Sequence, residues 1–348
     1  MRLLTRWHYL FGVMFSVFGV LARLVVPFLA VTAGVVSGGV ADLVHPMPAV
    51  RLVDEANPLE GKPFYVDPIS AAMIAAKNAS PPIPELTALA NTPASYWLDQ
   101  AFPAATVAGT VSRYTGAAQA AGATPVLTLY GIPHRDCGSF AAGGFATGAD
   151  YRRWIDGIAS GIGSAPAAII VEPDALAMAD CLSPDQRQER YDLIRYAVDT
   201  LTGNPSAAVY VDAGHSRWLN AEDMAGRLNT VGVDRARGFS LNTANFYTTD
   251  EEIGYGETLS ALTNGSHYVI DTSRNGLGPA ADTPLNWCNP GGRALGVPPT
   301  TATAGAHADA YLWIKRPGES DGSCDRGEPW AGRFMNQYAI ELAQNAGG

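Results

Sequence analysis

Short apolar runs alternate with helix-like segments along most of the chain. The clearest run, residues 168–171, is continuously apolar, which is typical of a strand buried on both faces. Predicted strands cover residues 64–67, 96–98, 125–130, 167–171, 207–211, 238–241, 267–270 and 310–314, and predicted helices cover residues 70–78, 106–121, 148–162, 184–202, 221–228 and 330–344. Strand followed by helix, repeated within one unit, indicates a barrel of parallel strands or a doubly wound sheet.

Acidic residues gather where these predicted strands end. In the central run Pro173 cannot donate to a strand ladder, so the strand stops and Glu172 and Asp174 fall on its exit loop. On this stretch alone, a cap on a following helix explains Asp174 better than catalysis does. Further acids follow other strands, namely Asp136, Asp212, Asp271, Glu319 and Asp321. A barrel brings all strand ends into one ring, whereas an open sheet places only two beside its crevice, so we expect a barrel.

The first 41 residues differ from the rest of the chain. Arg2 and Arg6 precede residues 9–40, which are almost wholly apolar or small, and small residues close the run near Ala41. This composition predicts an export segment, either a cleaved signal peptide or a retained N-terminal membrane anchor. Residues 42–56 indicate a linker, and we expect a single domain over residues 57–346.

Charge and cysteine content narrow the function classes. The chain has 23 Lys and Arg against 33 Asp and Glu, and removing residues 1–41 takes away three arginines and no acids, which argues against a nucleic-acid partner. The four cysteines, Cys137, Cys181, Cys288 and Cys324, show no zinc-site spacing, so an exported chain is expected to hold two disulfides. Of the three possible pairings, the sequential one closes the shortest loops.

The crowded acids suggest the reaction class. Neighbouring carboxylates repel, so one is expected to stay protonated near neutral pH, as a general acid requires. The sequence shows no G-x-S-x-G elbow, no glycine-rich phosphate loop after a strand and no H-E-x-x-H spacing. Paired carboxylates without a metal suit glycoside hydrolysis. The aromatic residues beside the same loops can stack on sugar faces or simply pack in the core, and Trp313, inside a predicted strand, is expected in the core.

Six segments, taken in order, resemble the motifs of a known family. They are YGIPHRDC (130–137), IIVEPDAL (169–176), YVDAGHSRW (210–218), DTSRNG (271–276), NWCNP (286–290) and LWIKRPGESDG (312–322). Together they resemble glycoside hydrolase family 6, the inverting β-1,4-glucanases, and most of all its secreted actinobacterial endoglucanases. The resemblance implies a distorted, TIM-like α/β barrel of about seven parallel strands, no metal or organic cofactor, and the disulfides Cys137–Cys181 and Cys288–Cys324.

The resemblance also implies a role for individual residues. Asp174 corresponds to the general acid, and Asp136 to the acid that supports its protonation and helps to handle the proton of the water. Asp321 corresponds to the candidate base, acting directly or through a water chain, and Asp212 to an acid that assists the site and substrate binding. Tyr130 corresponds to the tyrosine that helps to distort the reacting sugar. The implied sugar-binding residues are Trp97, His215, Trp218, Asn245, Trp287, Lys315 and Glu319.

The length of the chain favours internal cleavage of the glucan. The connections after Tyr247 and between Cys288 and Cys324 leave little surplus chain for loops that would roof a cleft. The alternatives are an exo-acting cellobiohydrolase of the same family and a non-catalytic glucan-binding envelope protein. The retained acids argue against the latter, because sugar binding does not need repelling charges. We expect a monomer, secreted or attached to the cell envelope, that touches a membrane only through its N-terminal segment.

Overall fold

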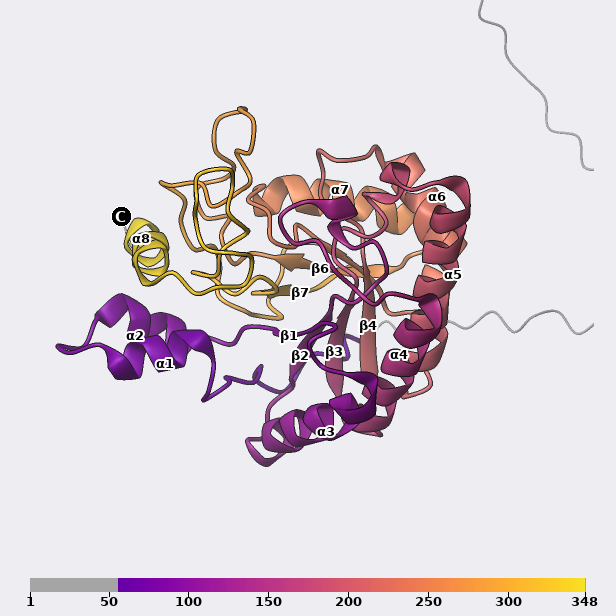
Figure 1. Cartoon of the computed structure of the whole chain (residues 1–348), viewed down its shortest axis with the longest axis horizontal. Coiled ribbons are helices and arrows are strands. Elements are labelled where there is room, and N and C mark those ends of the chain that lie inside the picture. Colours follow the sequence, from indigo (N-terminus) through magenta and orange to yellow (C-terminus); the bar gives the residue numbers. More distant parts are fainter. Residues whose placement is uncertain (1–55, 348) are drawn as a thin grey trace, which may run out of the picture. The chain divides into compact units, whose positions relative to one another are not determined.

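The protein folds around one curved sheet of parallel strands whose spatial order follows the sequence (Figure 1). The structure is a computed structural model that describes residues 56–347, so the predicted export segment and all but the last residue of the predicted linker lie outside the described residues. The strands are β1 Tyr96–Leu98, β2 Val126–Leu129, β3 Ala167–Val171, β4 Ala207–Asp212, β5 Gly238–Leu241, β6 His267–Asp271 and β7 Ala308–Leu312.

The sheet curls into a distorted barrel with a seam between β1 and β7. The order β1 to β7 contains no reversal, which excludes the doubly wound alternative and confirms the predicted barrel. Across the seam, the backbone N–H of Ser95 donates to the carbonyl of Trp313 at 2.9 Å, and the indole N–H of Trp97 donates to the carbonyl of Ile314 at 2.7 Å. These bonds join the residue before β1 and the middle of β1 to the two residues that follow β7.

Side chains alternate along each strand between two hydrophobic layers. In β3, Ile169 and Val171 pack with the outer helices, whereas Ala168 and Ile170 face the barrel interior. Because both faces are covered, the strand appears in the sequence as an unbroken apolar run. The interior layer contains Leu59, Phe64, Val126, Ala168, Ile170, Ala208, Tyr210, Val269, Ala310, Leu312 and Ile314.

Helices cover the outer face of the sheet and form a second group beside it (Figure 1). The outer helices are α3 Ala104–Ala120, α4 Gly148–Ile162, α5 Pro184–Leu201, α6 Ala221–Val231 and α7 Thr249–Leu262. The second group, α1 Ala71–Asn78, α2 Pro84–Ala90 and α8 Asn336–Ala346, packs around Trp313, whose burial confirms that it belongs to the core. No helix within residues 56–347 is both long and apolar enough to cross a bilayer.

Residues 57–65 fill the end of the barrel at which the strands begin. Leu59 and Phe64 join the interior layer, and the side-chain amide of Asn57 donates to the carbonyl of Asp309 in β7 at 2.6 Å. The carboxylate of Asp309 is buried at the same end, paired with Arg237 at 2.7 Å. The predicted strand at residues 64–67 is wrong: Phe64 makes one isolated bridge to Thr124, because β2 already has β1 and β3 as neighbours.

Three helix predictions also need correction. The predicted helix at residues 330–344 begins only at Asn336, because the preceding segment turns at Gly332, with a φ of 83°, and Phe334 then bridges to Glu319. The predictions omitted α2 and α7. In α7 two glycines lower helix propensity, but a β-carbon on Gly256 would come within 2.7 Å of the ring of Tyr268, so close packing on β6 requires glycine there.

Candidate active site

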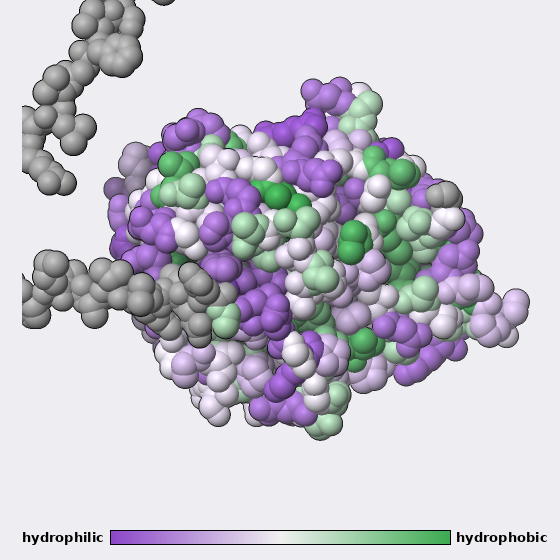
Figure 2. All heavy atoms as spheres, turned by 180° about the vertical axis from the view of Figure 1, so that it is seen from behind, coloured by the Kyte–Doolittle hydropathy of each residue, from purple (hydrophilic) through white to green (hydrophobic). Residues whose placement is uncertain are grey.

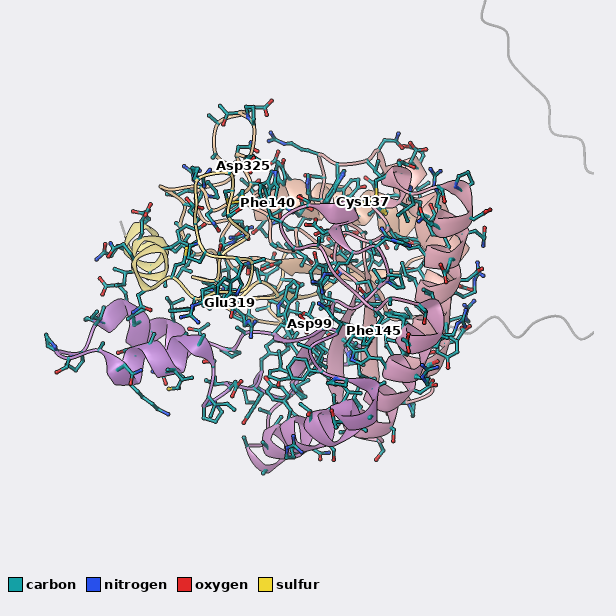
Figure 3. All side chains as sticks on the ribbon, viewed as in Figure 1. Asp99, Cys137, Phe140, Phe145, Glu319 and Asp325 are labelled. Carbon is teal, nitrogen blue, oxygen red and sulfur yellow. A yellow bond between two sulfur atoms is a disulfide. The ribbon has the colours of Figure 1, made fainter. Side chains whose placement is uncertain are left out.

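A cleft of about 650 Å³ opens at the end of the barrel where the strands finish. Its walls are loops that follow the strands, and Asp99, Phe140 and Glu319, labelled in Figure 3, lie on such loops. The predicted residues that line it are Trp97, Tyr130, Asp136, Asp174, His215, Trp218, Asn245, Trp287, Lys315, Glu319 and Asp321. The structure therefore brings together every predicted catalytic and sugar-binding residue except Asp212, which lies behind the wall.

Asp212 supports Asp174 from behind. One oxygen of Asp212 accepts the backbone N–H of Asp174 at 2.9 Å and that of Gly214 at 3.0 Å. The other accepts the hydroxyl groups of Ser240 at 2.9 Å and Thr243 at 2.7 Å. Burial raises the pKa of Asp212 to about 6, and these donors act against that rise. Because both oxygens already accept hydrogen bonds, the ionised form of Asp212 suits its surroundings.

Asp174 holds the proton of this pair. Burial raises its pKa well above the usual range, and the neighbouring charges of Asp212 and Asp136 raise it further. The residue has a positive φ of 69° on a tight turn after β3. Residues 173–178 form turns and no α-helix begins there, so the helix that Asp174 was expected to cap does not exist. The surroundings are those of a neutral acid that faces the cleft.

Two buried residues hold the loops of Asp136 and Asp174 together. Glu172 accepts the backbone N–H groups of Gly131 at 3.0 Å and Ile132 at 3.1 Å, just after Tyr130. Arg190, from α5, donates to the carbonyls of Pro133, His134 and Ala175 at 3.1, 2.7 and 3.2 Å. Neither residue lines the cleft. Their contacts fix the loop after β2 relative to the loop after β3.

Asp321 is charged, in contrast to Asp174. Its oxygens pair with the guanidinium of Arg274 at 2.7 Å and the ammonium of Lys315 at 3.0 Å, and one also accepts the backbone N–H of Asn289 at 3.0 Å. Burial opposes ionisation, but these cations outweigh it and hold the pKa of Asp321 below its usual value. The surroundings thus shift the two carboxyl groups of the cleft in opposite directions, raising the pKa of Asp174 and lowering that of Asp321.

Asp271, which was grouped with the rim acids, does not reach the cleft. Its buried carboxylate accepts the backbone N–H groups of Lys315 at 2.8 Å, Ser273 at 2.9 Å and Ala244 at 3.0 Å. It therefore joins the loops after β5, β6 and β7. Its predicted position at a strand end is confirmed. Its side chain points inward, where it accepts hydrogen bonds from buried backbone N–H groups that would otherwise be unpaired.

Aromatic rings form one wall of the cleft. The imidazole of His215 stacks on the ring of Tyr247, with centroids 4.3 Å apart, and contacts the tilted ring of Trp218 at 5.0 Å. The loop behind them is held by Glu252 of α7, whose buried carboxyl accepts the backbone N–H of Ser216 at 3.0 Å. Elsewhere in the cleft, Trp97 meets Tyr130 edge-on, with ring centroids 5.3 Å apart.

Comparison with known proteins decides the family. The model of glycosyl hydrolases family 6 matches residues 59–346, which is most of the chain. The chain belongs to glycosyl hydrolase family 6. This confirms the resemblance drawn from the motifs and the barrel that it implied.

The chain is also similar to individual endoglucanases. Endoglucanase A of Cellulomonas fimi is 44% identical over 285 residues, which is 81% of this chain and 61% of that protein, so the chain spans less than two thirds of that relative. Endoglucanase A of Thermobispora bispora is 39% identical over 92% of this chain and 69% of its own length. A solved Mycobacterium tuberculosis endoglucanase, in complex with methyl-cellobiosyl-4-deoxy-4-thio-β-D-cellobioside, is 82% identical with a TM-score of 0.84, covering 84% of this chain and all of that one.

Sequence reasoning missed part of this family 6 site. The cleft is also lined by Asp99, Arg135, Phe140, Arg217, Tyr247, Arg316 and Trp330. Trp330 was assigned to a helix that starts later. The buried supports Arg190 and Glu252 lie on helices, and no motif marks them, although the T-x-x-E capping box from Thr248 to Glu251 was a readable signal for the helix that carries Glu252.

The described residues contain no group of side chains arranged to bind a metal ion. Within residues 56–347 there is no group of three or more His, Cys, Asp or Glu side chains placed to hold an ion. That the enzyme needs no cofactor stays a prediction, which assays after dialysis against a chelator can test.

Both disulfides form in the predicted pairing and border the acids of this family 6 cleft. Cys137, which follows Asp136, is bonded to Cys181, and Cys288 is bonded to Cys324. Asn289, next to Cys288, is the residue whose backbone N–H donates to Asp321. Each cross-link therefore fixes a loop that carries, or directly contacts, a cleft carboxyl group.

Removing either disulfide is expected to lower the free energy of unfolding by about 3–4 kcal/mol. The two bonds close loops with sequence separations of 44 and 36 residues, and closing loops of this length lowers the conformational entropy of the unfolded chain. Paired Cys→Ser variants, unfolded in denaturant, measure this. Peptide mapping without reductant should recover Cys137 linked to Cys181 and Cys288 linked to Cys324. Four free thiols, or a peptide that links Cys137 to Cys324, would contradict the assignment.

Replacing Trp287 by Ala is expected to weaken oligosaccharide binding by about three- to tenfold, because it removes a stacking surface. The ring is 38% exposed, lines the cleft and lies 6.0 Å from the ring of Phe140, so the fold should persist. Calorimetric titration with cellotetraose, on a variant that does not turn over, measures the affinity. Trp313→Ala is the matched control and should lose stability instead. A sharp fall in melting temperature with unchanged affinity would show that Trp287 is a core residue.

Proposed function

We propose that this chain is an endo-acting β-1,4-glucanase that hydrolyses internal bonds of cellulose or a related β-glucan with inversion at the anomeric carbon. One observation carries the proposal: the cleft of this family 6 barrel holds two carboxyl groups in opposite surroundings, Asp174 buried against the carboxylate of Asp212, which favours its protonated form, and Asp321 paired with Arg274 and Lys315, which favours its ionised form. Inverting glycosidases use such a pair, one member as acid and the other on the side of the attacking water.

In the proposed reaction Asp174 gives its proton to the glycosidic oxygen as the bond from that oxygen to the anomeric carbon breaks. A water molecule forms the new carbon–oxygen bond from the opposite face and loses one proton toward Asp321, directly or through further water. Asp212, ionised behind the wall, favours the protonated form of Asp174 before the reaction and positions its backbone. Asp136, whose pKa burial also raises, assists Asp174 and the transfer of the water proton.

The ion pairs of Asp321 determine which catalytic role is proposed for it. A carboxylate whose pKa is lowered is a weak base, so its fixed negative charge also matters, because the transition state carries positive charge on the sugar ring. Arg274 and Lys315 hold that charge in one place. Tyr130, beside Asp174 and Asp136, is proposed to lie under the reacting sugar and help to distort its ring.

The remaining cleft residues are proposed to hold neighbouring sugars. Trp97, Trp218 and Trp287 offer ring faces, while Asn245, Lys315 and Glu319 offer polar groups. Burial, with a contribution from Arg217, lowers the pKa of His215 to about 4, so its imidazole is neutral near pH 7. Its Nδ1 accepts the backbone N–H of Arg217 at 3.2 Å, which leaves Nε2 to donate a hydrogen bond to a sugar.

Hydrolysis of carboxymethyl cellulose tests the proposal. An endo-acting enzyme lowers the viscosity of the solution early, while few reducing ends have appeared, whereas an exo-acting cellobiohydrolase, the alternative within the family, shows the reverse order. NMR of the first products of cellopentaose should show the α-anomer. Early β-anomer would contradict inversion. Tight binding of cello-oligosaccharides without any release of reducing sugar would instead support a non-catalytic glucan-binding protein.

We also propose that the protein acts outside the cytoplasm, as a monomer. Its two disulfides are typical of oxidising compartments, and on the face drawn in Figure 2 apolar residues are scattered among polar ones. Any membrane contact is proposed to be confined to residues 1–41. Cell fractionation locates the protein, and light scattering of residues 57–348 gives the mass of the particle in solution.

A further inference from the structure

Trp330 is an exposed indole in the cleft to which the proposed reaction gives no role. It is 72% exposed, yet it lines the same cleft as the acids. A large aromatic side chain left open to water inside a binding groove exposes apolar area that a ligand can cover.

The backbone fixes the place of Trp330. The hydroxyl of Ser320 donates to the carbonyl of Pro329 at 2.7 Å, and the backbone N–H of Gly332 donates to the carbonyl of Ser320 at 2.9 Å. One residue before Ser320, Glu319 forms a bridge with Phe334. Trp330 therefore stands on the wall of the cleft that carries Lys315 and Glu319, and it is held there before any ligand arrives.

The surroundings of the ring are polar. The guanidinium of Arg333 lies over the indole with its central carbon 5.9 Å from the ring centroid, on the same chain segment. On the cleft side, Arg316 and Glu319 form an ion pair at 2.8 Å, and both line the cleft. A single flat ring with charged hydrogen-bonding groups beside it suits a pyranose, which has apolar C–H faces and a rim of hydroxyl groups. An apolar peptide would cover this ion pair and the Arg333 guanidinium without offering either of them a hydrogen bond.

We infer that Trp330 forms an outer glucosyl subsite, in which the indole stacks on a sugar of the glucan beyond those held at Lys315 and Glu319. The inference rests on the proposed function, because it assumes that a β-1,4-glucan lies along the cleft. Arg316, which lines the same cleft and pairs with Glu319, is the charged group available to the hydroxyl groups of that sugar. The subsite adds affinity only for chains long enough to reach it.

The dependence of hydrolysis on substrate length tests this inference. For the wild type, kcat/KM should rise as cello-oligosaccharides lengthen from cellotriose to cellohexaose. Trp330→Ala should lose about fivefold for the chains that reach the ring and nothing for shorter ones. Trp330→Phe, which keeps a ring, should retain part of the gain. An unchanged melting temperature for both variants shows that the fold is kept.

Two results would overturn the subsite: kcat/KM values of Trp330→Ala equal to those of the wild type at every length, or an equal loss at every length. Failure of the proposed function looks different, because then the wild type hydrolyses none of the oligosaccharides. Calorimetric binding of the same length series to wild type and Trp330→Ala would still measure the contribution of the ring in that case.

Discussion

Asp174→Asn is expected to reduce hydrolysis of cello-oligosaccharides by about 10²- to 10⁴-fold, the range over which general acids contribute. A sugar leaving group departs as an alkoxide unless it is protonated, and an amide cannot supply that proton. A dinitrophenyl cellobioside has a leaving group that needs no proton, so the same variant should keep most of its activity on it. Parallel kinetics on the two substrates measure the difference.

Asp180→Asn serves as the matched control for that experiment. Asp180 is an exposed acid on the same connection as Asp174 and pairs with Arg227 at 2.6 Å outside the cleft, so its loss should leave both activities unchanged. An equal loss on both substrates by Asp174→Asn would contradict the role of Asp174 as the proton donor.

The raised pKa of Asp174 also fixes the sign of a stability effect. A carboxyl group whose pKa is higher in the folded chain contributes stability below its unfolded pKa, and that contribution is lost as pH rises through the folded pKa. Ionisation of Asp174 at pH 7 therefore costs the folded state more than it costs the unfolded chain. Asp174→Asn should be at least as stable as the wild type there, so its loss of activity cannot be ascribed to unfolding.

Asp321→Asn is expected to lose activity on both substrates, because the attack of water is common to them. It should also lower the free energy of unfolding by about 3–5 kcal/mol, since Arg274 and Lys315 keep their charges in a buried site. The pKa of Asp321 is lowered in the folded chain, so its stabilising contribution is present above the unfolded pKa and is lost as pH falls through the folded pKa. The stability difference should therefore narrow in acid.

A buried ion pair at the opposite end of the barrel separates these two effects. Asp309→Asn removes the carboxylate that pairs with Arg237 at 2.7 Å, far along β7 from the cleft loops, and should cost comparable stability while the folded fraction keeps full activity. Denaturant melts and activity per folded molecule are measured on both variants. If Asp321→Asn loses no more activity per folded molecule than Asp309→Asn, then Asp321 is only a structural residue.

The barrel could be predicted because its determinants are local. Strands buried on both faces leave apolar runs such as residues 168–171, and their polar ends mark the rim. Helix α7 was not predicted because Gly254 and Gly256 lower the helix propensity of its sequence. Its formation depends on packing against Tyr268. Tertiary packing of this kind leaves no periodic signal along the chain.

The cleft acids were predicted better than the residues that support them. Asp174 and Asp321 lie in recognisable motifs. Their chemical difference arises from contacts between distant loops, because Asp212 lies behind Asp174 and Arg274 pairs with Asp321. Arg190 shows the same limit, since a helical arginine that donates to three loop carbonyls resembles any surface arginine in the sequence. The direction of a side chain at a strand end cannot be predicted from the sequence either, and Asp271, whose side chain points inward, is an example.

The two disulfides beside the cleft link the order of the proposed catalytic site to the oxidation state of the chain. While the thiols are reduced, the loops beside Asp136 and Asp321 keep the freedom that the bonds remove, and the acid and the carboxylate lose their fixed separation. We therefore expect a chain with reduced thiols to form the barrel while the loops around the cleft stay less ordered.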